Sequence, residues 1–352
     1  MTYAVAAPLC RGVFSTFTIN SNSKLFTGLR ECWSREVYVQ SRRQHGMATD
    51  DFFARVKFRF VGCCIGWMFL WVCAAGFCGP IEHVVIVSMD GARPDYVLSA
   101  QSSNIQSMAA HGAFSWWAQT VNPSVTLISH ASMLTGCQPG KHGINWNTWK
   151  PEAGFVKTST CFELVKKSGG DTAMFIGKEK LCHIAKPGTV DKFERVKGKA
   201  EAISTAAAAY FMTNRPALMF VHYPDPDAAG HGFGWGSTQY LESIKNCDQG
   251  IGILRNAVGQ TGLASNTLFI ITADHGGHQR GHGTKNMRDM TIPWIAYSPE
   301  HVMPGEIQTE VSTCDTAATA VHALGLKIDP QWDGKALVEI FIPDKVKDGR
   351  ER

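Results

Sequence analysis

The stretch HVVIVSMDG (83–91) decides the fold, because an unbroken apolar, β-branched run leads directly into an aspartate and a glycine. A run of this kind is typical of a central strand that is buried on both faces of a sheet. Similar short runs recur along the chain at TAMFI (172–176), ALMFVHY (217–223), TLFIIT (267–272) and IPWIAY (292–297). We therefore expect five strands of one buried sheet.

Helical segments lie between these runs, such as AEAISTAAAAYFM (200–212) and residues 237–258. Strands that alternate with helices predict an α/β fold, with a mostly parallel central sheet and helices on both faces. Residues 82–345 should form one domain, because no repeat or low-complexity linker divides them.

The composition limits the class of protein. With 44% hydrophobic and 18% charged residues, the chain is neither disordered nor a nucleic-acid-coating protein, and we expect no nucleic-acid duplex as partner. A net charge of +4 helps an anionic substrate to approach. The eleven cysteines form no CxxC pair and have no regular spacing, so they indicate neither a zinc knuckle nor a disulfide scaffold.

A hydrophobic run, VGCCIGWMFLWVCAAGF (61–77), follows a basic segment and ends in small residues. This pattern is typical of a signal peptide, which we assign to residues 47–78. The run is also at the lower limit for a membrane span, so an N-terminal anchor is the alternative, and a buried helix is the third interpretation. Basic residues before the run predict an exported domain: periplasmic, secreted or membrane-anchored and facing outward.

Met47 would begin a signal peptide of ordinary length. Residues 1–46 carry no usable pattern, and we interpret them as an over-extended start. Residues 346–352 form a charged tail.

Acidic residues and histidines follow three of the five predicted strands. Asp90 ends the first, PDPDAAGH (224–231) follows the third, and Asp274 and His275 follow the fourth. Ligands of such sheets bind outside the carboxyl ends of the strands, and aspartate with histidine suits zinc and related divalent ions. Taken singly, Asp90 fits a turn equally well, and the residues of 224–231 could cap a helix.

The stretch FIITADHGGHQRGHGT (269–284) adds two more histidines, His278 and His282. Its glycines make a helix unfavourable, so a loop that lets side chains converge on an ion fits better. Solvated loop histidines are the alternative.

The stretch NPSVTLISHASMLTG (122–136) predicts a helix with Thr126 in its first turn and Gly136 at its end. A helix N-terminus favours an anion. The threonine hydroxyl is a useful nucleophile only where a cation lowers its pKa. A helix-capping threonine is the alternative.

Together these segments resemble the alkaline phosphatase superfamily and, within it, the type I phosphodiesterase / nucleotide pyrophosphatase family. The resemblance covers about residues 82–340. It rests on five segments in the family's order: SMDG (88–91), PSVTLISHASMLTG (123–136), HGINWN (142–147), PDAAGH (226–231) and ADHGGHQRGHG (273–283). The fold it implies is the three-layer α/β/α sandwich of alkaline phosphatases.

The resemblance implies a hydrolase of phosphoric esters or pyrophosphates with two divalent metal ions, normally zinc. One ion would be held by Asp90, Asp274 and His275 and would activate Thr126, while the other would be held by Asp227, His231 and His282. Thr126 would form a phospho-threonine intermediate, and Asn147 would contact a phosphoryl oxygen. His278 would not be a ligand. The implied partner is a small phosphorylated substrate such as a nucleotide, with membrane contact only through an N-terminal anchor.

The chain departs from the family at positions that select the substrate. Nucleotide-cleaving members carry an aromatic residue after the nucleophile and a tyrosine before the PD segment, where this chain has Leu127 and His222. Lys178 and Lys180, in IGKEKL (176–181), resemble the residues with which phosphomonoesterases and phosphonoacetate-type phosphonate hydrolases bind a doubly charged substrate. An exposed loop is the other interpretation of these lysines. No sulfatase signature occurs, and outside the enzymes the alternative is a degenerate protein that only binds metal or phosphate.

Overall fold

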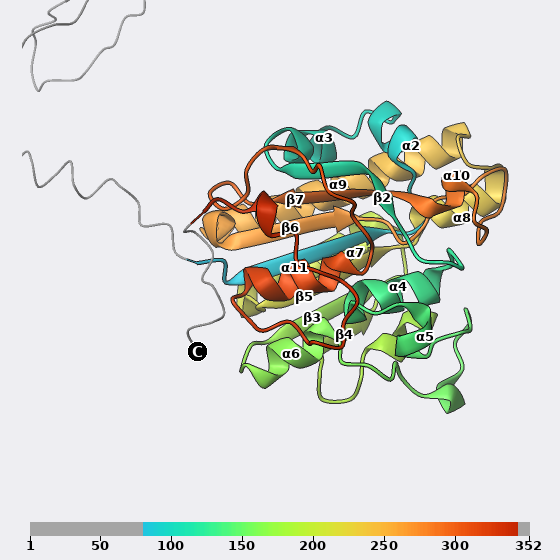
Figure 1. Cartoon of the computed structure of the whole chain (residues 1–352). Helices are drawn as coiled ribbons and strands as arrows, with labels where there is room; N and C mark the ends of the chain where they lie inside the picture. Colours follow the sequence, from blue (N-terminus) through green and yellow to red (C-terminus); the bar gives the residue numbers. More distant parts are fainter. Residues whose placement is uncertain (1–79, 344–352) are drawn as a thin grey trace, which may run out of the picture. The chain divides into compact units, whose positions relative to one another are not determined.

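The computed structural model describes residues 80–343, in which one sheet lies between two layers of helices (Figure 1). In chain order the strands are β1 (His83–Met89), β2 (Ala113–Gln119), β3 (Thr172–Ile176), β4 (Lys192–Arg195), β5 (Leu218–Tyr223), β6 (Thr267–Thr272), β7 (Thr291–Tyr297) and β8 (Gly305–Glu306). The α-helices are α2 (Pro94–Ser99), α3 (Ser103–Ala110), α4 (Thr126–Thr135), α5 (Pro139–His142), α6 (Cys161–Lys167), α7 (Ala200–Asn214), α8 (Asp225–Phe233), α9 (Thr238–Gln260), α10 (Met287–Met290) and α11 (Asp315–Ala323).

The strand order is β4-β3-β5-β1-β6-β7-β2-β8. All neighbouring pairs are parallel except β6–β7 and β7–β2, so β7 alone runs against the other strands of this sheet. The mostly parallel sheet, the five predicted strands and the three predicted helices (α4, α7 and α9) are thus confirmed. The strands β2, β4 and β8 were not predicted.

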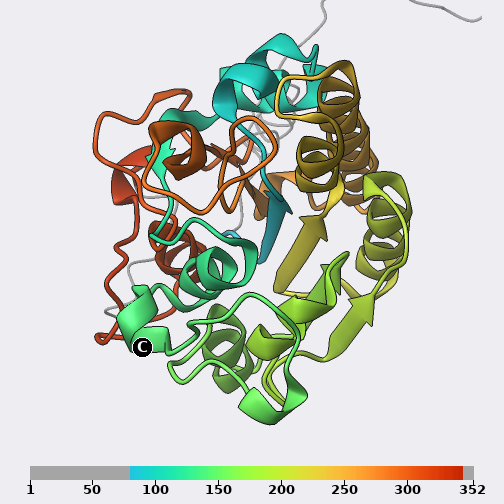
Figure 2. The same ribbon diagram turned by 90° about the vertical axis from the view of Figure 1, so that its right-hand side faces the viewer.

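The helices cover both faces of the sheet. The helices α7 and α9 pack against each other on one face together with α3, while α4, α6 and α11 pack together on the opposite face. Figure 2 shows the strands in the middle, with α7 and α9 on one side and α4 and α11 on the other. This arrangement is the three-layer α/β/α sandwich that the family resemblance implied.

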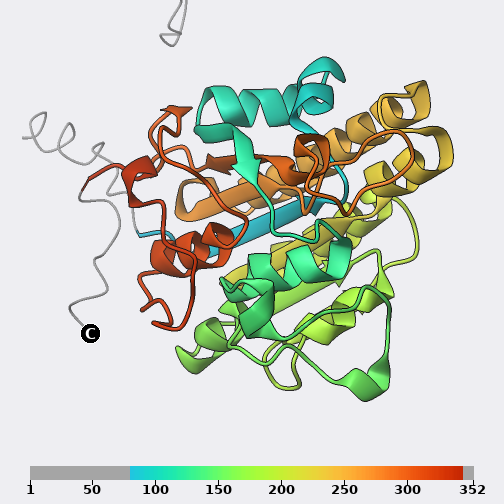
Figure 3. The same cartoon turned by 45° about the vertical axis from the view of Figure 1, so that its right-hand side comes forward.

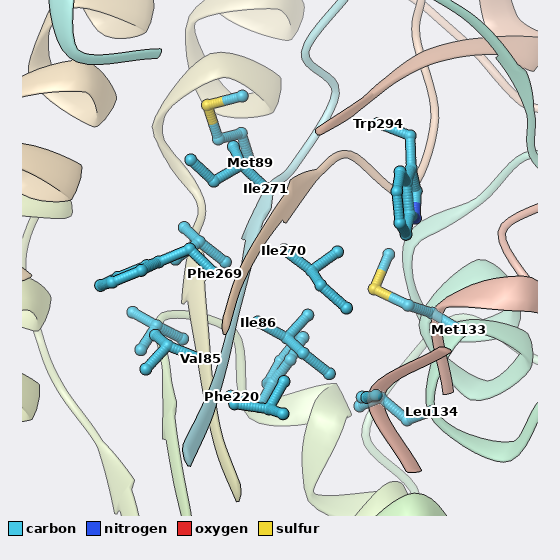
Figure 4. Packing of buried hydrophobic residues seen from close by; sticks show 14 of the residues in the cluster. Val85, Ile86, Met89, Met133, Leu134, Phe220, Phe269, Ile270, Ile271 and Trp294 are labelled. Atoms are coloured by element: carbon cyan, nitrogen blue, oxygen red, sulfur yellow. The ribbon is translucent and has the colours of Figure 1, made fainter. Parts of the chain in front are cut away.

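Successive apolar side chains of the central strands point to opposite faces of the sheet. In Figure 4, Ile86, Phe220 and Ile270 point toward α4, where Met133 and Leu134 meet them, while Val85 and Phe269 point to the other side. The register of the strands agrees with this arrangement, because Ile86 pairs with both Phe220 and Ile270. Two buried faces explain why these strands read as continuous apolar runs. The core holds β5, β1 and β6 side by side and so fixes where their carboxyl ends lie.

The predicted signal or anchor (47–78), the predicted over-extended start (1–46) and the charged tail (346–352) lie outside the described residues. Among the helices of residues 80–343, none is long and apolar enough to cross a bilayer.

His142, at the end of α5, couples the packing of α5 on α4 to pH. Its ring is fully buried, its Nε2 lies 3.1 Å from the hydroxyl of Ser132, and its Nδ1 accepts a hydrogen bond from the backbone N–H of Ile144. Burial lowers the pKa of His142 to about 4. The folded state therefore binds fewer protons than the unfolded state between that value and the ordinary pKa of about 6.5, and stability falls as the pH falls through this window.

We expect the wild-type protein to lose about 2 kcal/mol more unfolding free energy between pH 7.5 and pH 5 than His142→Gln, which cannot titrate. Urea unfolding of both proteins with a chelator present measures the difference. Parallel losses in the two proteins would contradict the assignment.

Candidate functional site

The three strands that end in acidic residues are neighbours in the sheet, in the order β5-β1-β6. Asp90 directly follows β1, Asp227 lies in the first turn of α8 after β5, and Asp274 and His275 follow β6. Figure 3 shows α4 (teal) at the same end of the sheet as the loop 273–286 (orange). The predicted convergence of these residues at the carboxyl ends of the strands is therefore observed.

The first predicted ligand set is assembled as three facing atoms. Nε2 of His275 lies 3.5 Å from Oδ1 of Asp90 and 3.3 Å from Oδ2 of Asp274. All three atoms are buried and form no hydrogen bond. The second oxygen of each carboxylate is engaged elsewhere: that of Asp274 accepts from the backbone N–H of Gly91 and of His275, both at 3.0 Å. The free atoms therefore face one another across a small gap.

The second predicted set meets at Oδ1 of Asp227. Nε2 of His231 lies 3.3 Å from this atom, Nε2 of His282 lies 3.4 Å from it, and the two nitrogens are 3.2 Å apart. Asp227 and His231 are one helical turn apart on α8, as their spacing requires. Gly91, with φ +73°, lets α8 approach, because a Cβ there would lie 3.1 Å from Cα of Asp227.

His275 also joins the second set. Its ring stacks on that of His282 with centroids 3.7 Å apart, and the donor atoms of Asp227, His275 and His282 lie within 4.8 Å of one another. The two ligand sets are thus adjacent, with the His275 ring between them. His231 is the most exposed of these side chains, at 48%.

The pKa values of the two carboxyl groups in the first set shift in opposite directions, which indicates that a nearby cation would stabilise the ionised form of both. Burial and then the nearby Asp90 raise the pKa of Asp274 well above its usual value. Burial also opposes ionisation of Asp90, but Lys178 and His222 outweigh it and hold its pKa well below the usual range. Burial, and then His275, lower the pKa of His282 to about 4, so this imidazole is neutral. Histidine binds a metal ion as the neutral imidazole, and aspartate binds it as the ionised carboxylate.

The donor set fits two divalent ions. Buried polar atoms are normally hydrogen-bonded, yet four atoms here have no hydrogen bond: Oδ1 of Asp90, Oδ1 of Asp227, Oδ2 of Asp274 and Nε2 of His275. Each is a carboxylate oxygen or an imidazole nitrogen, which are ligand atoms that zinc accepts. A cation between them would supply the missing partner for every one of these atoms.

Lys178 reaches into the site from the end of β3. Its Nζ lies 2.7 Å from Oδ2 of Asp90 and 2.5 Å from Oδ2 of Asp227, so it bridges one carboxylate of each ligand set. These two carboxylates raise the pKa of Lys178 despite its burial. The lysine therefore neutralises the carboxylate oxygens that face away from the ligand gap and holds the two sets together.

Thr126 is the first residue of α4 and is buried. The ring of His130 connects it to the site, because Nδ1 of His130 lies 2.7 Å from the carbonyl oxygen of Thr126 and 3.4 Å from Oδ2 of Asp274. Val125, not Thr126, occupies the capping position, so the helix-capping alternative is wrong. Oδ1 of Asn147 accepts hydrogen bonds from the backbone N–H of Leu127 (2.9 Å) and from Nζ of Lys180 (3.2 Å). With Oδ1 engaged twice, the amide NH₂ of Asn147 is the group left to donate to an oxygen near Thr126.

Two histidines behind the site were not predicted to act there. His130 lies 2.7 Å from the hydroxyl of Ser88 and 2.7 Å from the carbonyl of Thr126, and it packs 5.0 Å from the ring of His222. His222 contacts Oδ2 of Asp90 at 2.9 Å. The spacing of four residues between Thr126 and His130 on one helix is the sequence signal that could have revealed the first contact. Side chains in such positions orient the groups that they contact, here the carboxylate of Asp90 and the first turn of α4.

His222 and Leu127, at the two positions that grip a base in nucleotide-cleaving members, are both fully buried. Trp235 packs against Gly230 and Gly277, and its indole N–H donates to the carbonyl of Gly91.

Comparisons with known proteins agree with this geometry. The family model "Type I phosphodiesterase / nucleotide pyrophosphatase" matches residues 84–289. Ectonucleotide pyrophosphatase/phosphodiesterase family member 3 of Mus musculus is 26% identical over 229 residues, which cover 58% of this chain and 26% of that protein. Phosphopentomutase of Agathobacter rectalis is 28% identical over 202 residues, covering 54% of this chain and 48% of that protein. The chain thus spans less than half the length of these two relatives.

Among solved structures, murine ectonucleotide pyrophosphatase / phosphodiesterase 5 in complex with AMP has the same fold. It superposes with a TM-score of 0.64 at 14% identity, over 74% of this chain and 100% of that chain. Since the family model spans more than half of the 352 residues, from β1 to α10, this chain belongs to the type I phosphodiesterase / nucleotide pyrophosphatase family.

Proposed function

We propose that this chain is a metal-dependent hydrolase of phosphoric esters or pyrophosphates, with Thr126 as nucleophile and two ions of the zinc type. One observation carries the proposal: four buried ligand atoms without hydrogen bonds face one another beside the first turn of α4. The first ligand set would comprise Asp90, Asp274 and His275, and the second Asp227, His231 and His282. The presence of every ligand and of the nucleophile argues against a degenerate binding protein.

The chemistry of the residues follows from their positions. Two such ions, when bound, would lower the pKa of the Thr126 hydroxyl and neutralise charge on the phosphoryl oxygens. Oγ1 of Thr126 gives its proton to water and attacks phosphorus, and the bond from phosphorus to the leaving oxygen breaks. The leaving oxygen departs with the electron pair of that bond and takes up a proton from water. Water then attacks phosphorus of the phospho-threonine, the bond to Oγ1 breaks, and the phosphate product departs while the threonine regains a proton.

Stabilisation of the transferring group comes from fixed donors. The NH₂ group of Asn147 donates to a non-bridging oxygen, and the N-terminus of α4 places positive dipole at the same point. Both donors are already held in place before substrate arrives, since Oδ1 of Asn147 is bonded to the backbone N–H of Leu127, next to the nucleophile.

A phosphomonoesterase or phosphonate hydrolase is the second candidate, and the position of Lys180 favours it. Its ammonium is partly buried, donates to Asn147, and forms no ion pair among residues 80–343. Burial, and then Lys178, lower the pKa of Lys180. A cation of this kind beside the phosphoryl site is matched by a second negative charge on the substrate, whether a monoester dianion or a carboxylate.

The comparison of two substrates tests the alternatives. We expect Lys180→Met to reduce kcat/KM for p-nitrophenyl phosphate about tenfold and to leave that for bis-p-nitrophenyl phosphate within about twofold, because only the monoester carries a second charge. Lys197→Met, on the loop after β4, serves as a control for the loss of a lysine elsewhere. Equal losses on both substrates would show that Lys180 does not read substrate charge. If the wild-type protein with zinc cleaved neither substrate, a phosphonate would become the next substrate to assay.

We also propose that the protein is exported, as a periplasmic, secreted or outward-facing anchored enzyme. The support is the sequence pattern of residues 47–78 and the name of the murine relative, which describes an ectoenzyme. The proposed partner is a small phosphorylated molecule. A nucleotide is the class bound by the murine structural neighbour, although the aromatic pair that grips a base is replaced here by Leu127 and His222.

A further inference from the structure

One buried carboxylate, that of Asp289 in α10, fastens the loop that follows β6. Its Oδ2 accepts hydrogen bonds from the backbone N–H (3.0 Å) and the hydroxyl (2.7 Å) of Thr284, and its Oδ1 accepts from Nδ1 of His278 (2.6 Å). The side chain of Asp289 is fully buried. Burial raises its pKa, but the bonds from Thr284 and His278 outweigh this and hold the pKa below its usual value. The group is therefore an ionised carboxylate with three donors.

The backbone of α10 holds the beginning of the same loop. The N–H of Gly276 donates to the carbonyl of Asp289 (2.8 Å), and the N–H of Gly277 donates to the carbonyl of Arg288 (2.7 Å). The approach is so close that a Cβ on Gly276 would lie 2.1 Å from the carbonyl oxygen of Arg288. Asp289 thus contacts this loop at Gly276, directly after His275, and at Thr284, two residues after His282.

Two hydrogen bonds of Ser124 connect this loop to the second ligand set. The hydroxyl of Ser124 donates to the carbonyl of Thr284 (2.9 Å), and the carbonyl of Ser124 accepts from Nδ1 of His282 (2.8 Å). Because a carbonyl can only accept, the proton of His282 is on Nδ1, and the lone pair of Nε2 faces Asp227. This is the tautomer that a metal ligand requires.

We propose that Asp289 is a positioning residue: by fastening the loop 276–284 through Thr284 and His278, it holds His282 in the place and tautomer that the second ligand set needs. The inference rests on the proposed function, in which that set binds a metal ion. It gives His278 a role as a support of the loop rather than as a ligand.

The test compares Asp289→Asn with Asp248→Asn, a matched control. Asp248 is also a buried aspartate that accepts backbone N–H groups, from Asn104 (3.2 Å) and Ile105 (2.8 Å), but it fastens the start of α3. Zinc binding is measured by equilibrium dialysis against a chromogenic chelator. We expect Asp289→Asn to keep one tight zinc ion and to bind the second about 10–100-fold more weakly. Asp248→Asn should be less stable but bind both ions as the wild-type protein does.

Amide hydrogen exchange of the zinc-free proteins gives a second readout. Exchange at Gly276 and Thr284 should accelerate in Asp289→Asn and stay unchanged in Asp248→Asn. Wild-type affinity for both ions, or unchanged exchange at these amides, would overturn the positioning role. If the wild-type protein itself bound fewer than two zinc ions, the two-metal proposal would fail, and exchange alone would decide whether Asp289 fastens the loop.

Discussion

Replacement of Thr126 by alanine should lower kcat/KM on the preferred phosphate ester by on the order of 10³-fold or more, because the variant has no oxygen to attack phosphorus. Thr126 begins α4, its side chain is buried, and the hydrogen bond from Leu127 to Asn147 fixes the adjacent backbone. The ligand atoms do not depend on the threonine, so the variant should still bind zinc. Steady-state kinetics and zinc content of the purified protein measure the two effects.

Two further variants separate chemistry from packing. Thr126→Ser keeps a hydroxyl and should retain measurable activity. Thr135→Ala removes a buried threonine from the other end of α4, where the hydroxyl bonds to the carbonyl of Ala131, and should affect stability but not kcat/KM. Acid quenching during turnover should reveal a phosphoryl group on the α4 peptide of the wild-type protein and of Thr135→Ala, but not of Thr126→Ala. An alanine variant with more than a tenth of wild-type activity would rule Thr126 out as nucleophile.

The site could be predicted from the sequence because acidic residues follow the ends of apolar strands. Asp90, Asp227 and Asp274 each follow a run that is buried on both faces, and only the carboxyl end of a central strand offers a charged side chain a common cleft. The order of the strands was not needed for this inference. The pattern of residues also predicted α4, which runs from Thr126 to Thr135 and ends before Gly136, whose φ is +62°.

Strand direction and polar contacts were beyond the sequence. The run 292–297 has the same apolar composition as the runs that form parallel strands, yet β7 is antiparallel to β6. The composition of a buried strand does not depend on its direction. The strand β2 was missed because its residues are only partly buried and mix Trp and Ser. The bridge from Lys178 to two carboxylates joins residues 49 or more positions apart, and no local spacing signals such a contact.

Asp274→Asn should have opposite effects on the zinc-free and the zinc-loaded protein. Without zinc, Oδ2 of Asp274 and Oδ1 of Asp90 are two buried carboxylate oxygens without hydrogen bonds. Asparagine keeps an oxygen for the N–H groups of Gly91 and His275, and its NH₂ can donate to the unpaired atoms of Asp90 and His275. The zinc-free variant should therefore unfold at the same temperature as the wild-type protein or at a higher one.

With zinc at about 100 times its dissociation constant, the wild-type protein should gain about 2.7 kcal/mol for each ion bound. The variant should gain little more than half of the wild-type total, because an amide is a poorer ligand than a carboxylate and the first set has lost its charge, while the second set is unchanged. Thermal unfolding followed by circular dichroism, with chelator and with zinc, measures both effects. Asp225→Asn is the matched control, since Asp225 also has a buried oxygen without a hydrogen bond but bonds to the N–H of Ala200 instead of facing the ligand gap. If Asp274→Asn gained as much from zinc as the wild-type protein, Asp274 would not be a ligand, and the unpaired atoms at the end of β1 and β6 would need another explanation.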